Sequence, residues 1–113
     1  MCHYSFSGRV TYEDGSPVVG LEMMAECEEK QMIFSNSVKT DEQGRYTLSV
    51  PLKTNIRAGL KMMPDGYTTR EDLYEGYINS IVGRNDINFT LIKASESSSN
   101  SSNYGAFFRK MTN

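Results

Sequence analysis

The chain contains one histidine, two cysteines and no tryptophan among its 113 residues. Zinc sites and Ser–His or Cys–His catalytic centres need several of these residue types, so the inventory excludes most such centres. The lone His3 lies beside Cys2 at the start of the chain, where a terminal copper or nickel site is the alternative to a frayed histidine without a role. We therefore expect a protein with no catalytic residue, no metal and no cofactor.

The two cysteines, Cys2 and Cys27, both fall on the inward side of expected strands. A disulfide between them requires the start of the first strand to lie near the end of the second, which holds if the two strands face each other in opposite directions. Two buried thiols and a lipid-modified Cys2 are the alternatives that the sequence leaves open.

Strong charge and long apolar runs are also missing. The chain has 12 Lys and Arg against 14 Asp and Glu, a formal charge of −2, and no run of four basic residues, so nucleic acid is not an expected partner. No stretch approaches the roughly 18 apolar residues of a membrane span, and the N-terminus lacks the basic and apolar regions of a secretory signal. These absences predict a soluble chain without a membrane span or a signal peptide.

Polar and apolar residues alternate in short runs over the first ninety or so residues, which predicts strands with one buried face. Turn residues separate the runs at 13–17, 40–44, 51 and 64–66. The side chains expected to face the core are Tyr4, Phe6, Val10, Tyr12, Leu21, Met23, Ala25, Cys27, Met32, Phe34, Val38, Tyr46, Leu48, Val50, Ile56, Ala58, Leu60, Met62, Ile87, Phe89 and Leu91.

One segment has a helical period instead. Apolar residues from Leu73 to Ile81 recur every three to four positions, and Thr68 with Glu71 has the form of a capping box, so we expect one short helix near 69–79. Gly76 shortens this helix, and a brief strand over 78–82 is the alternative.

The composition divides the chain into three parts. Residues 1–94 form the predicted β-sandwich domain. Residues 95–103 form a linker, because six of these nine residues are serine. Residues 104–113 form an apolar tail that is expected to dock on its own sandwich, on a second copy or on a partner. The residues expected to dock are Tyr104, Phe107, Phe108 and Met111.

Several short motifs resemble the carboxypeptidase regulatory-like domain of the transthyretin-like, or prealbumin-like, β-sandwiches. They are Gly8-Arg9-Val10, Gly15-Ser16-Pro17-Val18-Val19-Gly20-Leu21, Thr40-Asp41-Glu42-Gln43-Gly44-Arg45-Tyr46-Thr47-Leu48 and Pro64-Asp65-Gly66-Tyr67. The resemblance covers residues 5–67 well and residues 86–93 by position. The chain departs from the family pattern at 51–55 and in the longer region 68–84.

The resemblance implies an all-β fold, a seven-stranded antiparallel Greek-key β-sandwich of transthyretin-like type, whose first two long strands belong to opposite sheets. It also implies an accessory module of bacterial origin, exported or in the cell envelope. Members of this kind take their function from a partner.

We therefore expect a non-catalytic interaction module that binds through the 64–84 loop region or the tail. Tyrosine and arginine are favoured anchors of interfaces, and the expected partner-binding residues are Tyr67, Arg70, Asp72, Tyr74, Tyr77 and Asn79. A protein is the expected partner and a glycan the second candidate, because glycan sites often use tryptophan and this chain has none. The alternatives are a structural subunit that forms homo-oligomers through its tail and a small hydrolase that uses carboxylates among Asp65, Glu71, Asp72 and Asp86.

Overall fold

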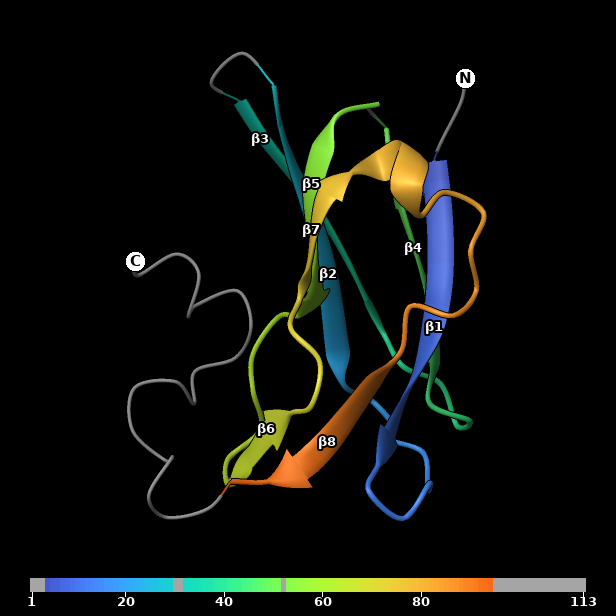
Figure 1. Cartoon of the computed structure of the whole chain (residues 1–113), viewed down its shortest axis with the longest axis vertical. Coiled ribbons are helices and arrows are strands. Elements are labelled where there is room, and N and C mark those ends of the chain that lie inside the picture. Colours follow the sequence, from blue (N-terminus) through green and yellow to red (C-terminus); the bar gives the residue numbers. More distant parts are fainter. Residues whose placement is uncertain (1–3, 30–31, 52, 95–113) are drawn as a thin grey trace.

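The chain folds into two four-stranded β-sheets (Figure 1). The structure is a computed structural model that describes residues 4–29, 32–51 and 53–94. In chain order the strands are β1 (Tyr4–Tyr12), β2 (Glu22–Glu29), β3 (Met32–Lys39), β4 (Arg45–Val50), β5 (Asn55–Leu60), β6 (Tyr67–Thr69), β7 (Tyr74–Tyr77) and β8 (Phe89–Lys93). A single 3₁₀ turn, η1 (Ile78–Ser80), follows β7. The all-β prediction is therefore confirmed.

The strand order is β4-β1-β8-β6 in one sheet and β3-β2-β5-β7 in the other. The first two long strands, β1 and β2, thus lie in opposite sheets, as the resemblance implied. All pairings are antiparallel except that of β1 with β8, which is parallel. The described residues form eight strands where seven were expected, because the region 67–77 contributes two short strands.

The helix expected near 69–79 is not formed, and this prediction was wrong. Residues 70–73 cross from one sheet to the other, β7 pairs with β5, and only the 3₁₀ turn η1 is helical. Glu71 does not cap a helix, because its carboxylate accepts hydrogen bonds from the backbone N–H and the hydroxyl of Thr90 on β8, at 2.7 and 3.1 Å. The pairing partners of this segment therefore decide its structure against its apolar spacing.

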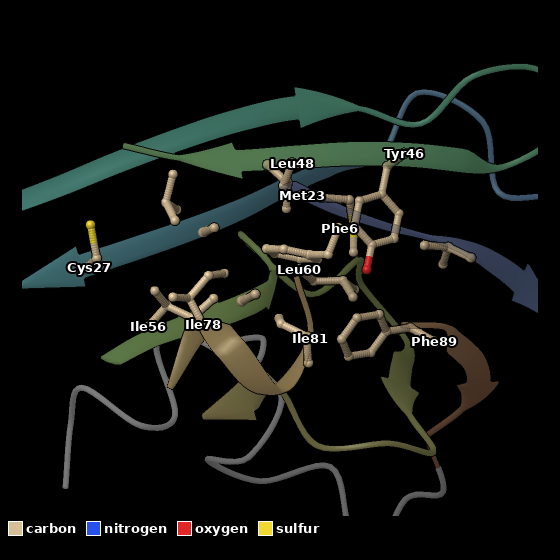
Figure 2. Packing of buried hydrophobic residues seen from close by; sticks show 14 of the residues in the cluster. Phe6, Met23, Cys27, Tyr46, Leu48, Ile56, Leu60, Ile78, Ile81 and Phe89 are labelled. Carbon is tan, nitrogen blue, oxygen red and sulfur yellow. The ribbon is translucent and has the colours of Figure 1, made fainter. Parts of the chain in front are cut away.

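The core lies between the two sheets, and most positions expected to be inward are buried there (Figure 2). Figure 2 shows Met23 and Leu60 from one sheet meeting Phe6 and Phe89 from the other. The expected inward residues that are buried are Phe6, Val10, Met23, Ala25, Cys27, Tyr46, Leu48, Val50, Ile56, Ala58, Leu60, Phe89 and Leu91. The partly buried ones that pack against them are Tyr4, Tyr12, Leu21, Val38 and Ile87.

Three inward positions were predicted wrongly. Met32 and Phe34 are 59% and 37% exposed, because the β2–β3 hairpin projects from the body of the sandwich (upper left of Figure 1) and nothing described there covers its inner face. Met62 is 56% exposed, because β5 ends at Leu60 and Met63, at 4%, points into the core instead.

Thr40, the first residue of the Thr-Asp-x-x-Gly-x-Tyr motif, is the one buried polar residue that the described part of the chain contains. Its hydroxyl donates to the carbonyl of Val18 at 2.6 Å and accepts from the N–H of Leu21 at 2.9 Å. The hydroxyl thus satisfies two backbone groups of the β1–β2 connection. The motif therefore holds the entry to β2 against the end of β3.

The rest of this motif forms the tight β3–β4 turn. Asp41 Oδ1 accepts hydrogen bonds from the backbone N–H groups of Gln43 and Arg45, at 2.9 and 2.8 Å. Gly44 has a φ of 78°, and a Cβ at this position would lie 2.5 Å from the carbonyl oxygen of Val10. Only glycine suits both the left-handed conformation and this close approach.

Tyr46 ends the motif and joins β4 to the segment before β8. Its ring is buried, and its hydroxyl donates to the carbonyl of Ile87 at 2.5 Å. Burial raises the pKa of the phenol, so the group remains a protonated donor. The residues that carry the family resemblance thus have structural tasks in this fold.

Some predictions concern residues outside the described ranges. These are the linker 95–103, the tail 104–113 with its four apolar docking residues, His3 and Cys2. Cys27 has its thiol in the core. In the described part of the chain, no helix has the length and apolar character that a membrane crossing requires.

Candidate functional site

The six residues expected to bind a partner are divided between the two sheets. Tyr67 lies on β6 and Arg70 directly follows that strand, whereas Tyr74 and Tyr77 lie on β7 and Asn79 on η1. Asp72 is exposed in the crossing between them. Tyr67 and Arg70 therefore belong to one sheet, whereas Tyr74, Tyr77 and Asn79 follow the crossing to the other.

The crossing is fixed to β8. The N–H of Arg70 donates to the carbonyl of Thr90 at 2.9 Å, in addition to the two hydrogen bonds that the Glu71 carboxylate accepts from Thr90. Leu73 is 5% exposed, so the crossing also contributes an apolar anchor. Glu71, one of the carboxylates considered for catalysis, is thus used to position the chain.

Tyr74 and Tyr77 on β7 serve mainly the local structure. The ring of Tyr74 lies over Gly76 and packs against the core, and its hydroxyl donates to the carbonyl of Tyr77 at 2.9 Å. Tyr77 is 44% exposed, and its hydroxyl donates to the carbonyl of Lys53 at 3.1 Å. Asn79 is exposed beside them on η1.

Tyr67 lines an open pocket of about 310 Å³ at the end of the sandwich where β6, β8 and the β1–β2 turn meet. The lining residues, which define what we call the Tyr12–Tyr67 pocket, are Tyr12, Glu13, Asp14, Ser16, Tyr67, Leu91 and Lys93. The centroids of the two tyrosine rings are 5.6 Å apart, and the rings are inclined by 51°. The two rings are therefore in contact with each other and together form an aromatic wall of the pocket.

Strand register explains why these residues meet. The parallel pairing of β1 with β8 sets Tyr12 beside Leu91, and the antiparallel pairing of β8 with β6 sets Tyr67 beside Lys93. Residues paired across a sheet point to the same side, and Leu91 points into the core, so all four share the inner face. The pocket is the part of this inner face that extends past the core.

Charged groups surround the two tyrosine rings of the pocket. Glu13 lies 3.6 Å from the Arg70 guanidinium, so the second predicted residue stands at the rim of the pocket. The hydroxyl and the backbone N–H of Ser16 both donate to Asp14 Oδ1, at 2.6 and 2.9 Å, and these hydrogen bonds lower the pKa of Asp14. Two carboxylates, Glu13 and Asp14, thus stand beside two cations, Lys93 in the lining and Arg70 at the rim.

We expect the pKa of Asp14 to rise toward its usual value in Ser16→Ala, because the variant removes the hydroxyl donor that contributes most to the shift. Because the pKa of Asp14 is lower in the folded chain than in the unfolded chain, its ionised carboxylate stabilises the turn at any pH above the unfolded pKa. This stabilisation is lost as the pH falls through the folded pKa. NMR titration of the carboxyl carbons measures the pKa of Asp14 in the wild-type chain and in the variant.

The pKa of Asp86 provides the control in the same titration. It is lowered by hydrogen bonds from Arg84, at 2.9 Å from each carboxylate oxygen, and not by Ser16. It should therefore not move in Ser16→Ala. An Asp14 pKa that stays the same in the variant would contradict the hydrogen-bonded turn.

The carboxylates considered for catalysis have separate surroundings. Asp65 is exposed in the turn before β6, Glu71 is bound to Thr90, and Asp86 is paired with Arg84. A general acid needs a raised pKa, and that of Asp86 is lowered. Within the ranges that the structure describes, no group of three or more His, Cys, Asp or Glu side chains is arranged to hold a metal ion.

Most residues of the pocket were not predicted from the sequence. Tyr12 was assigned to the core and residues 13–17 to a turn, while Lys93 had no assigned role. The turn signal at Asp14-Gly15 was visible, but its position next to β6 depends on pairings between distant segments.

Comparison of the chain with models of protein families finds no match, and no curated protein is found to be similar to it.

Proposed function

We propose that the chain is a non-catalytic β-sandwich interaction module that binds a segment of a protein partner in the Tyr12–Tyr67 pocket. One observation carries this proposal: Tyr67, expected from the sequence to bind a partner, lines an open pocket with a second tyrosine and charged groups, and Arg70, also expected to bind, is ion-paired with Glu13 of that lining. Tyrosine and arginine are enriched among residues that dominate binding energies.

The chemistry of the pocket favours a peptide side chain over a sugar. A sugar ring stacks on a flat aromatic platform, whereas these two rings are inclined by 51° and pack against each other, so they present an uneven apolar wall that suits a peptide side chain. Asp14, which accepts from the neutral donors of Ser16 while Glu13 is paired with Arg70, complements a cation on the partner. We therefore propose an aromatic or branched aliphatic residue next to a lysine or arginine as the recognised segment.

The kinship to the carboxypeptidase regulatory-like domains, with their Greek-key connections, is part of the same proposal. The structural tasks of Thr40, Gly44 and Tyr46 support it, since these motif residues have a physical reason to be where they are. An exported or cell-envelope location follows from that kinship and is proposed with it. The separate surroundings of Glu71 and Asp86 favour binding over hydrolysis.

A displayed library of random peptides, with the full chain as bait, tests the proposed function. We expect enriched peptides to carry an apolar residue beside a basic one. Tyr67→Ala should weaken the binding of an enriched peptide by about 10-fold or more, as measured by fluorescence anisotropy, because it removes one of the two rings of the aromatic wall.

Tyr77→Ala is the matched control, because Tyr77 is an exposed tyrosine on the other sheet. It should leave peptide affinity unchanged, and urea unfolding of both variants checks that each is folded. Absence of any enriched peptide, or an equal loss in both variants, would contradict the proposal. Binding to a glycan array without binding to peptides would make glycan the ligand instead.

A further inference from the structure

β3 is a long open edge of its sheet. It is the outermost strand next to β2, it has eight residues, and the six residues from Met32 to Ser37 are all exposed. The edges β6 and β7 have three and four residues. The fourth edge, β4, has six residues, and the Asn36 side chain of β3 donates to the carbonyl of its Ser49 at 3.0 Å while Asn36 itself remains exposed.

Apolar side chains occupy both faces of this edge. Ile33 is 65% exposed on the outer face, and Met32 and Phe34 are 59% and 37% exposed on the inner face, where Phe34 is paired with the buried Cys27. An occupant that covers both faces must continue the sheet, so the edge fits another strand better than a ligand that lies on one face.

The edge also lacks the usual protection against pairing. Edge strands of soluble proteins carry charges, prolines or bulges that prevent another strand from adding to them. Residues 32–38 contain no charged residue, no proline and no glycine, and Lys39 is the first charge along the strand. A strand of this composition is suited to being paired.

We propose that β3 pairs with β3 of a second copy of this chain, antiparallel and across a twofold axis at Asn36. Pairing about Asn36 matches inner face with inner face, so that the two sheets become one continuous sheet. Phe34 then meets Val38 of the second copy, and Ser35 meets Ser37. Two of these pairs match in character, since Phe34 and Val38 are apolar and Ser35 and Ser37 are polar. Pairing about Ser35 would instead set Phe34 against Asn36.

Charge also favours a second copy in this register. The two Lys39 residues stand three positions on either side of the axis, about 20 Å apart, which exceeds the screening length of about 8 Å at physiological salt. Lys39 of the second copy pairs with Ile33, so its aliphatic stem lies along the apolar side chain while the ammonium group stays in water.

Sedimentation velocity of the full chain over a range of concentrations tests this proposal. We expect a dimer, and we expect Ile33→Lys to weaken it by about 100-fold or more, because the substitution acts twice across the axis. Val82→Lys, at an exposed valine beside β1 in the other sheet, is the matched control and should leave the dimer unchanged.

A full-length Phe107→Ser/Phe108→Ser variant separates this interface from assembly through the tail. It should remain dimeric. A monomeric wild-type chain, a dimer that persists in Ile33→Lys, or loss of the dimer in the tail variant would each overturn the proposal.

A cross-link tests the register independently of how Ile33→Lys folds. In a Cys2→Ser background, Asn36→Cys should form a disulfide-linked dimer on mild oxidation, because residues paired across a twofold axis have Cα atoms about 5 Å apart. Thr47→Cys, on the exposed face of β4, should not. A dimer in which Asn36→Cys stays uncross-linked would overturn the pairing about Asn36.

Discussion

Replacing Gly8 by alanine should lower the free energy of unfolding by about 3 kcal/mol or more, the largest effect we expect from the addition of a single methyl group. A Cβ at this position would lie 1.8 Å from the carbonyl oxygen of Ile87 and 2.4 Å from its carbonyl carbon. Both are backbone atoms, so no change of side-chain rotamer relieves the overlap, and β1 must separate from the segment before β8.

That separation would disturb further contacts of Ile87. The N–H of Ile87 donates to the carbonyl of Ser7 at 3.1 Å, and its carbonyl accepts from the hydroxyl of Tyr46. Urea unfolding followed by circular dichroism measures the loss, since the chain has no tryptophan to report by fluorescence.

Gly15→Ala is the control for Gly8→Ala. Gly15 has a φ of 90°, and nothing lies within 4 Å of a Cβ built there. Its substitution therefore measures only the cost of a left-handed conformation, about 1 kcal/mol. Equal losses in the two variants would show that the close approach of β1 to Ile87 does not exist.

The strands and most of the core could be predicted because alternation is a local property. Phe6, Leu48 and Phe89 each lie in a run of period two, and each is buried. Alternation does not indicate how far the opposite sheet extends across the core. Met32 and Phe34 follow the same pattern, yet they are exposed because the hairpin extends past the opposite sheet.

The region 69–79 could not be predicted because its local signals conflict with its partners. The apolar spacing around Leu73 and Ile78 fits a helix, and Thr68 with Glu71 fits a cap. In the structure Thr90 binds the Glu71 carboxylate and β5 pairs with β7, so the segment is extended. Both partners are distant in sequence, and no local pattern identifies them.

The candidate site was half predictable for the same reason. Tyr67 and Arg70 stand in a segment that is rich in interface-type residues, which is visible in the sequence. Tyr12, Asp14 and Lys93 come from two other segments, and the parallel pairing of β1 with β8 brings them to the pocket. A parallel pairing between the first and last described strands leaves no signal in a short window.

The two proposed binding surfaces have one structural origin. The sheets are offset along the long axis, so that each leaves part of its inner face uncovered (Figure 1). At one end this part is the β2–β3 hairpin with Met32 and Phe34, and at the other it is the Tyr12–Tyr67 pocket. A partner segment in the pocket and a second copy at β3 would therefore bind at opposite ends and would not compete.

Thr40→Val should lower the free energy of unfolding by about 2 to 3 kcal/mol, because it leaves two backbone groups without their partner. Valine keeps the shape and the branching of threonine, so the variant removes only the hydroxyl. The carbonyl of Val18 loses its donor and the N–H of Leu21 loses its acceptor, and Val18 is 5% exposed. Thermal unfolding and urea unfolding should both report this loss.

Thr40→Ser completes the test, because it keeps the hydroxyl and removes the methyl group. We expect it to cost about 1 kcal/mol, the value for one buried methyl group. The backbone hydrogen bonds of residue 40 to Leu21 and Gly20 are the same in both variants, so, relative to wild type, Thr40→Val reports the hydroxyl and Thr40→Ser reports the methyl group. If Thr40→Ser were the less stable of the two, the first residue of the motif would act by packing, and the β1–β2 connection would be held by its backbone without help from the side chain.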